Sequence, residues 1–202
     1  MLDRTIPFYN TILRCDRFQH TEVVLPGGFS IVPYAKGYEK AWAELECAIG
    51  DFESLEEAEQ YFTETYLQDP ALFGNLLFLL NEENTVIGSC IAWQDKRGDS
   101  LVSSLHWLVV DEKYHGRGLG KALCCAVMNI YEAQGKFPVY IHTQPWSWKA
   151  IFLYLSLGFK LQKTDTFSHY VNEYDKAMTE LKKIVTEEQF SLLQTLSEYE
   201  TT

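Results

Sequence analysis

Residues 108–122 read LVVDEKYHGRGLGKA, an apolar run followed by a turn that places three glycines within five positions. The run ends at Val110, and a helical pattern of apolar residues begins at Leu119. Glycine permits a tight turn and a close approach between backbone and ligand. The free N–H groups at the start of a helix favour an anion, typically a phosphate group. The stretch therefore predicts a strand, a phosphate-binding turn and a helix.

Two common phosphate-binding motifs do not fit this turn. A dinucleotide fingerprint, GxGxxG, that starts at Gly116 would need glycine at position 121, where Lys121 stands. A nucleoside-triphosphate loop would need glycine at 115 and Ser or Thr at 122, but His115 and Ala122 occupy these positions. A different phosphorylated ligand is therefore expected, and Arg117 and Lys121 add positive charge for it.

The sequence around the turn predicts an α/β fold. Gly135 ends the helix, and a strand is expected over 138–143. A strand–helix–strand unit of this length joins two parallel strands. Upstream, the patterns predict helices over 37–49 and 54–67 and strands over 29–33, 76–80, 85–93 and 101–110, with a turn at 95–100. The second of these helices begins with a candidate capping box, Ser54 and Glu57. The central sheet is therefore mixed, antiparallel early and parallel in the middle, with flanking helices.

Composition narrows the class of protein. With 17 basic and 28 acidic residues, the net charge of −11 argues against a nucleic-acid-binding surface. Apolar runs such as Leu76–Leu80 are far too short to cross a membrane, and residues 1–28 lack a signal-peptide pattern. A soluble cytoplasmic protein is expected. Five irregularly spaced cysteines predict reduced core thiols, and neither they nor the histidines have metal-ligand spacing.

The charge is distributed unevenly along the chain. Residues 29–110 carry a net charge of −10, whereas residues 111–160, which contain the glycine-rich turn, carry +3. A positive segment inside an acidic chain agrees with a phosphorylated ligand at the turn.

The turn resembles the pyrophosphate-binding motif of the GNAT superfamily of acyl-CoA-dependent N-acyltransferases. The resemblance rests on residues 108–111 followed by residues 115–120. That motif usually reads Gln/Arg-x-x-Gly-x-Gly/Ala, so His115 departs from it at the leading position while the glycines are kept. A second stretch is similar to the helix that follows in the family: Ala150-x-x-Leu153-Tyr154-x-x-x-Gly158-Phe159, with Ser147 where asparagine is common. Residues 140–146 resemble one bacterial branch of the family.

The resemblance covers residues 29–160 and implies the GNAT fold for that core. Residues 1–28 would then be an N-terminal extension, and residues 161–202 a mostly helical C-terminal extension of the same domain. Helices are expected over 175–185 and 187–198, with a capping box of Thr186 and Gln189 between them. Two roles stay open for these helices: covering the sheet, or contacting a second subunit in a homodimer.

In this family an acetyl group passes directly from acetyl-CoA to an amine within a ternary complex. The resemblance implies that acetyl-CoA is bound by Leu108, Val109, Val110, His115, Gly116, Arg117, Gly118, Leu119, Gly120, Lys121, Ser147 and Ala150. A backbone N–H near Val109 or Val110 would stabilise the oxyanion. Tyr154, a phenol with a pKa near ~10, would donate a proton to the departing thiolate. The alternative for Tyr154 is a packing role in a buried helix over 147–157.

The general base is the least determined role. An ammonium group like that of lysine is neutral in only about one molecule in a thousand at pH 7, so its proton must be removed. Several GNAT enzymes use a glutamate on the strand before the motif, where this chain has His106. His106 is the candidate base, Glu46 and His142 are its rivals, and an ordinary hydrogen-bonded histidine is the alternative.

The acceptor is expected to be a small-molecule or peptide amine. Nine acidic residues lie from Glu39 to Glu64, a segment that contains the two predicted helices that border the acceptor groove in the family. They form either a solvated face or a groove that attracts a cationic amine, and Glu44, Glu46 and Glu53 belong to this groove. Trp146 and Trp148 could line the acyl or acceptor pocket or pack in the core. Two other functions stay open: a non-catalytic acyl-CoA-binding or regulatory module, and acetylation of protein N-termini or lysines.

Overall fold

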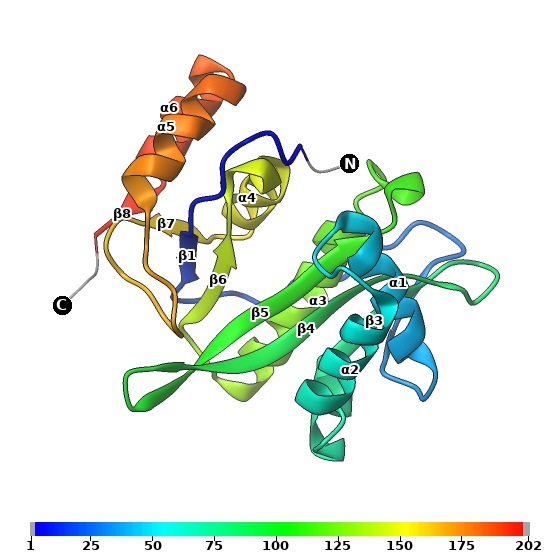
Figure 1. The fold of residues 1–202 in the computed structure, drawn as a ribbon. Coiled ribbons are helices and arrows are strands. Elements are labelled where there is room, and N and C mark those ends of the chain that lie inside the picture. Colours follow the sequence, from blue (N-terminus) through cyan, green and yellow to red (C-terminus); the bar gives the residue numbers. More distant parts are fainter. Residues whose placement is uncertain (1–2, 200–202) are drawn as a thin grey trace. The chain divides into compact units, whose positions relative to one another are not determined.

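The computed structural model describes residues 3–199, which form two units (Figure 1). The first unit comprises His20–Trp93 and Leu105–Gln134, and the second comprises residues 3–19, Gln94–Ser104 and 135–199. The strands are β1 (Thr11–Cys15), β2 (Ser30–Pro33), β3 (Leu76–Leu80), β4 (Val86–Arg97), β5 (Ser100–Val110), β6 (Val139–Thr143), β7 (Lys160–Gln162) and β8 (Ser197–Glu198). The α-helices are α1 (Tyr38–Ile49), α2 (Leu55–Tyr66), α3 (Leu119–Gln134), α4 (Trp148–Ser156), α5 (Tyr174–Ile184) and α6 (Glu187–Thr195).

The strand order is β2-β3-β4-β5-β6-β1-β7-β8. The pairs β2–β3 and β3–β4 are antiparallel, and β5 pairs in parallel with β6 through Ser103 and Ser104. This arrangement confirms the predicted α/β fold with a mixed sheet, antiparallel early and parallel at the strand–helix–strand unit.

In the first unit, β3 is covered on both of its faces, and each of its residues is buried. Successive side chains of a strand point to opposite faces. Leu76 and Phe78 therefore pack into the core cluster with α1 and α2, while Leu77 and Leu79 face the side on which α3 contacts β3. This two-sided burial explains why the strand is continuously apolar instead of alternating.

The ends of the helices in this unit follow the predicted signals with one exception. Ser54 Oγ accepts a hydrogen bond from Glu57 N at 3.1 Å and caps α2. The carboxylate of Glu57 accepts from Glu53 N at 3.3 Å instead of from Ser54 N, so the predicted capping box is only half formed. Gly135 adopts φ 63° directly after α3, as the helix stop requires.

The hairpin between β4 and β5 is longer than the sequence predicted. β4 continues to Arg97 and β5 starts at Ser100, so the turn shrinks from residues 95–100 to Gly98 and the residue after it. The residues from Gln94 to Arg97 are polar and alternate between exposed and half-buried. A strand with one solvated face has this pattern, which also resembles the composition of a loop.

In the second unit, β1 lies between β6 and β7 and is antiparallel to both. Residues 11–15, within the predicted N-terminal extension, are thus a strand of the sheet. The capping box of Thr186 and Gln189 is confirmed, and α5 agrees with its predicted range to within one residue at each end. The last predicted helix was too long, because α6 ends at Thr195 and β8 pairs in parallel with β7.

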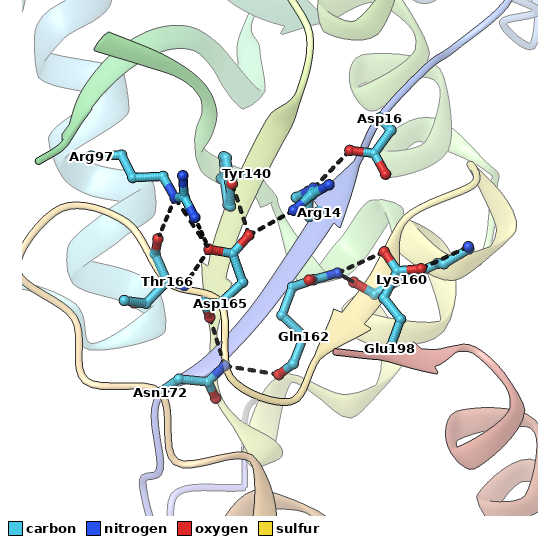
Figure 2. Close-up of polar contacts among 10 residues, drawn as sticks. All are labelled: Arg14, Asp16, Arg97, Tyr140, Lys160, Gln162, Asp165, Thr166, Asn172 and Glu198. Atoms are coloured by element: carbon cyan, nitrogen blue, oxygen red, sulfur yellow. Dashed lines mark hydrogen bonds and ion pairs between the residues drawn. The ribbon is translucent and has the colours of Figure 1, made fainter. Parts of the chain in front are cut away.

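A buried carboxylate joins distant segments of the second unit (Figure 2). Asp165 is 1% exposed and accepts hydrogen bonds from Arg14 Nη1 at 2.9 Å, Arg97 Nη2 at 2.7 Å and Tyr140 Oη at 2.9 Å. Asn172 Nδ2 donates to the backbone carbonyl of Asp165 at 2.8 Å and to a second carbonyl, that of residue 162, at 2.8 Å. Burial raises the pKa of Asp165, but the two arginines and the tyrosine outweigh it and hold the pKa below its usual value. Burial and this carboxylate raise the pKa of Tyr140 to about 12.

The cysteines agree with the prediction of reduced core thiols. All five are free, and all except Cys47 are buried. Within residues 3–199, none of the helices combines the length and hydrophobicity that a membrane span requires.

Candidate functional site

The glycine-rich turn lies between β5 and α3 in the first unit, as predicted. Gly116 and Gly118 adopt φ angles of 77° and 78°, a backbone region that other residues rarely occupy. A Cβ atom added at either glycine would meet no atom within 4 Å, so the backbone here is open to a ligand. The first hydrogen bond of α3 runs from Ala122 N to the carbonyl of Gly118 at 3.0 Å. The N–H groups of the first turn before Ala122 therefore have no helical partner and can bind an anion.

The side chains of the turn have separate roles. His115 Nε2 donates a hydrogen bond to the carbonyl of Val110 at 2.8 Å, which ties the turn back to the end of β5. The guanidinium of Arg117 lies over the rings of Tyr114 and Phe29, at 5.4 and 5.9 Å from their centroids. The side chain of Lys121 is exposed on the first turn of α3. Arg117 lies between the two glycines in the sequence and Lys121 follows Gly118 by three residues, so the turn carries two positive charges, which fits a phosphate-bearing ligand such as coenzyme A.

The strand before the turn carries a backbone irregularity at Trp107. This residue has φ 49°, a value that is unusual for a bulky side chain and marks a bulge in β5. In a regular strand, His106 and Trp107 would point to opposite faces. Both contact α2 instead: His106 Nδ1 lies 3.4 Å from Tyr66 Oη, and the Trp107 ring lies 5.7 Å from that of Tyr61. The bulge therefore turns the candidate base toward the α2 side.

Val109, two residues after this bulge, lies where β4 and β5 approach closely. A Cβ added to Gly88 would come within 2.7 Å of the carbonyl of Val109, so only glycine fits at this position of β4. Asp111 N donates to the carbonyl of Ile87 at 2.8 Å, which holds the end of β5 to β4. In the strand order β5 lies between β4 and β6, and its pairing with β6 is made at Ser103 and Ser104.

Among the rivals for the base, Glu46 differs most from expectation. Its side chain is 1% exposed, whereas Glu44 and Glu53 are exposed to solvent. Neither carboxylate oxygen of Glu46 has a hydrogen-bond partner among residues 3–199. Burial raises the pKa of Glu46 well above its usual value, and the negative charge of Asp51 raises it further. Glu46 is thus buried inside the first unit, whereas Glu44 on the same helix and Glu53 in the loop before α2 face solvent.

The remaining predicted residues lie in the second unit, on or beside α4. Tyr154 is 6% exposed and its ring lies 6.1 Å from that of Phe159. Ser147 Oγ accepts a hydrogen bond from Gln144 Nε2 at 2.9 Å, and Ala150 is half-buried. The prediction of a buried helix over 147–157 is confirmed only in part: Ile151, Tyr154 and Leu155 are the buried residues of α4, and its other apolar side chains are partly exposed.

His142 and Trp146 have structural partners in the second unit. His142 Nε2 donates to Asn10 Oδ1 at 2.8 Å, and its ring is stacked on Tyr170 at 3.7 Å. Trp146 packs against Phe8 at 5.3 Å and lies under the guanidinium of Arg4 at 4.9 Å. These contacts favour packing over pocket-lining for Trp146, and they occupy one ring nitrogen of His142.

The structure adds residues that sequence reasoning missed. The hydroxyl of Tyr66 lies beside His106 and also interacts with the side chains of Tyr61 and Trp107. The available signal was the pair His106-Trp107, because two consecutive large rings in a half-buried strand indicate a break in the alternation. No group of three His, Cys, Asp or Glu side chains within residues 3–199 is placed to hold a metal ion.

The part of the chain that contains the glycine-rich turn and α4 also matches a known protein family. The model of the acetyltransferase (GNAT) family matches residues 38–159, which is more than half of the sequence. The chain belongs to the GNAT acetyltransferase family. The family uses acetyl-CoA. The open backbone at Gly116 and Gly118 lies within the matched residues, in the turn that the sequence resemblance assigns to this cofactor.

Solved GNAT structures share the fold. A GCN5-related N-acetyltransferase from Sphaerobacter thermophilus is 18% identical with a TM-score of 0.57, and the match covers 76% of this chain and 48% of that one. A GNAT acetyltransferase from Colwellia psychrerythraea is 12% identical with a TM-score of 0.58, and the match covers 77% of this chain and 53% of that one. This chain thus spans only about half the length of each of these two relatives. Glucosamine-6-phosphate N-acetyltransferase from Arabidopsis thaliana is 19% identical with a TM-score of 0.53, and the match covers 70% of this chain and 97% of that one. No match was found among functionally curated proteins.

Proposed function

We propose that this chain transfers an acetyl group from acetyl-CoA to a primary amine, by direct attack within a ternary complex. The single observation that carries the proposal is the turn before α3, where open glycine backbone, helix N–H groups and two cationic side chains lie together. Membership of the GNAT family supplies acetyl-CoA as the donor. In this proposal residues 29–160 hold the catalytic core, and the segments on either side extend it.

The proposed steps use side chains already described. The N–H groups of the turn and residues 115–121 bind the pyrophosphate, and a backbone N–H at Val109 or Val110 stabilises the oxyanion. His106 accepts the proton of the amine, directly or through the hydroxyl of Tyr66. The neutral amine nitrogen then attacks the thioester carbonyl, and the resulting tetrahedral intermediate loses the second proton of its nitrogen to water as the carbon–sulfur bond breaks. Tyr154 gives its proton to the departing sulfur, and Ser147 and Ala150 at the start of α4 contact the cofactor.

The acidic face of α1 and α2 supports a cationic acceptor. The exposed carboxylates of this region, including Glu44 on α1 and Glu53 in the loop before α2, raise the local concentration of cations by long-range attraction. The effect weakens with salt because surface charges are screened over about 8 Å at physiological ionic strength. A small cationic amine is therefore proposed as the acceptor.

Substitution of Gly118 by alanine is expected to weaken acetyl-CoA binding by about tenfold or more. The new methyl group would enter the open space beside the backbone, where the pyrophosphate is proposed to lie. Gly98 is a matched control, because it also has positive φ, 59°, and open space, but it lies in the β4–β5 hairpin. Each alanine costs about 1–2 kcal/mol of backbone strain. Calorimetric titration should show loss of affinity for the Gly118 variant alone, and equal affinities would contradict the proposed cradle.

An amine panel tests the function itself. Release of free thiol from acetyl-CoA is measured with small mono- and diamines, amino sugars, and peptides with free N-termini or lysines. Acceleration by small cationic amines supports the proposal. Acceleration by peptides alone identifies a protein acetyltransferase, and acetyl-CoA binding without acceleration by any acceptor identifies a non-catalytic module.

A further inference from the structure

Two buried polar groups without partners lie on one face of α1. Glu46 is 1% exposed, and both of its carboxylate oxygens lack a hydrogen-bond partner within residues 3–199. Trp42, one helical turn earlier, has a buried ring N–H that also lacks a partner there. Most buried polar groups in folded proteins are hydrogen-bonded, and leaving a carboxylate buried and unpaired is costly. Such a pair on one helix face indicates a binding role and not a packing role.

Four aromatic rings gather around this face of α1: Trp42, Phe52, Tyr61 and Trp107. The centroids of every pair lie 5.4–6.1 Å apart. Trp42 is fully buried, but the other three rings are half-buried and reach the surface of the first unit. The faces of aromatic rings attract cations, and they do so more strongly where water is excluded. We name this group together with Glu46 the carboxyl–ring cluster.

The cluster favours a cation over other ligands. The charge that acts on Glu46 is that of Asp51, which repels it, so an added positive charge would relieve the repulsion. An ammonium group can also donate hydrogen bonds to the carboxylate oxygens, which an anion or a hydrocarbon cannot do.

The cluster lies a short way along β5 from the proposed acyl position. Trp107 belongs to the cluster and precedes Val109 by two residues, which span at most about 7 Å even in a regular, fully extended strand. A ligand that reaches from the Val109 backbone to the ring of Trp107 therefore needs a spacer of only a few carbon atoms.

We propose that the carboxyl–ring cluster holds a second cationic centre of the acceptor, so that the preferred acceptor is a primary amine with another ammonium group a few carbons away. This inference rests on the proposed function. The reacting amine must lose its proton before it attacks, whereas the second ammonium keeps its charge and pairs with Glu46. Glu46 is then a specificity-determining residue and takes no part in the proton transfers.

Binding should be coupled to proton release. At any given pH, burial keeps more of Glu46 protonated than of an exposed carboxyl, and a bound cation favours the carboxylate. The other titratable groups around Glu46 are Cys47 and Asp51 at the end of α1 and Tyr66 on α2, with Tyr61 and His106 beside Tyr66.

The test compares kcat/KM for diaminopropane and propylamine in the wild type, Glu46→Gln and Glu188→Gln. Glu188 is the control, because it is an exposed glutamate on α6, outside the acidic segment from Glu39 to Glu64. The wild type and Glu188→Gln should prefer the diamine by about tenfold or more. Glu46→Gln should lose this preference and keep its rate with propylamine. A wild type without the preference, or a Glu46→Gln variant that keeps it, would overturn the inference.

A binding measurement separates this inference from the proposed function. Diaminopropane is titrated into the protein by calorimetry in two buffers of different ionisation enthalpy, and proton release is expected from the wild type but not from Glu46→Gln. Thermal unfolding should show the variant to be at least as stable as the wild type at neutral pH, because the substitution removes a carboxyl group that is buried without a hydrogen-bond partner. If no amine accelerates thiol release, the proposed function fails while calorimetry still tests the cation site. Absence of proton release from the wild type would overturn the site alone.

Discussion

Asp165→Ala is expected to lower the free energy of unfolding by about 3–5 kcal/mol, the usual cost of removing one partner from a buried ion pair. The substitution leaves Arg14, which is 12% exposed, and the fully buried hydroxyl of Tyr140 without their shared acceptor. It also removes the hydrogen bonds that Arg97 of the β4–β5 hairpin donates to the Asp165 carboxylate, while the hydrogen bond from Arg97 to the backbone carbonyl of Thr166 is kept. Urea denaturation of the two proteins measures the difference. Asp16→Ala removes an exposed partner of Arg14, and about 0–1 kcal/mol is expected for this control.

The pH dependence of stability provides a second readout for the same carboxylate. Its pKa is lowered in the folded protein, so its stabilising effect is fully present above the unfolded-state value of 3.8. The effect is lost as the pH falls through the lower folded-state pKa, where the carboxylate takes up a proton. In Asp165→Asn this loss should be absent, and the stability difference between wild type and variant should shrink below pH 4. A constant difference throughout the acid range would contradict the role of the charge.

Tyr154→Phe is expected to lower kcat by about a hundredfold or more, with little change in acetyl-CoA affinity. General acids typically contribute 10²- to 10⁴-fold, and phenylalanine keeps the ring while removing the proton that the thiolate would receive. Thiol release under saturating amine measures the effect. Tyr131→Phe is the control, because Tyr131 is equally buried and its hydroxyl donates to the carbonyl of Trp93 at 2.8 Å.

The pH dependence of the transfer rate gives a second test of the role of Tyr154 as a general acid. If Tyr154 is the general acid, the basic limb of the wild-type profile should be missing or displaced in the variant. A Tyr154→Phe variant with the wild-type rate at every pH would show that the tyrosine only packs in α4. A comparable loss in Tyr131→Phe would indicate a general effect of removing a buried hydroxyl.

The turn and its flanking elements were predictable because their signals are local. The spacing of Gly116, Gly118 and Gly120 predicted the turn, and the periodicity after Leu119 predicted α3. The parallel pairing of β5 and β6 followed from the length of the crossover. These inferences depend on residues close in sequence, where turn geometry and helix period act directly.

The polar partners of the fold could not be read from the sequence. Asp165 binds Arg97 and Arg14 across 68 and 151 positions of the chain, and no local pattern marks such pairs. The environment of Glu46 was hidden for another reason. On a helix rich in acidic residues, nothing in the local sequence distinguishes the buried Glu46 from the exposed Glu44. Composition predicted the acidic face but not which carboxylate lies inside.

Transfer of labelled acetyl from acetyl-CoA tests the central claim most directly. The protein is incubated with acetyl-labelled acetyl-CoA, with and without a small diamine, and the label is followed in protein, amine and free acetate. The account predicts no label on the protein in either case, and equal amounts of labelled N-acetyl amine and free coenzyme A when the amine is present. Label bound covalently to the protein without amine, or release of coenzyme A with labelled acetate but no acetylated amine, would contradict direct transfer in a ternary complex.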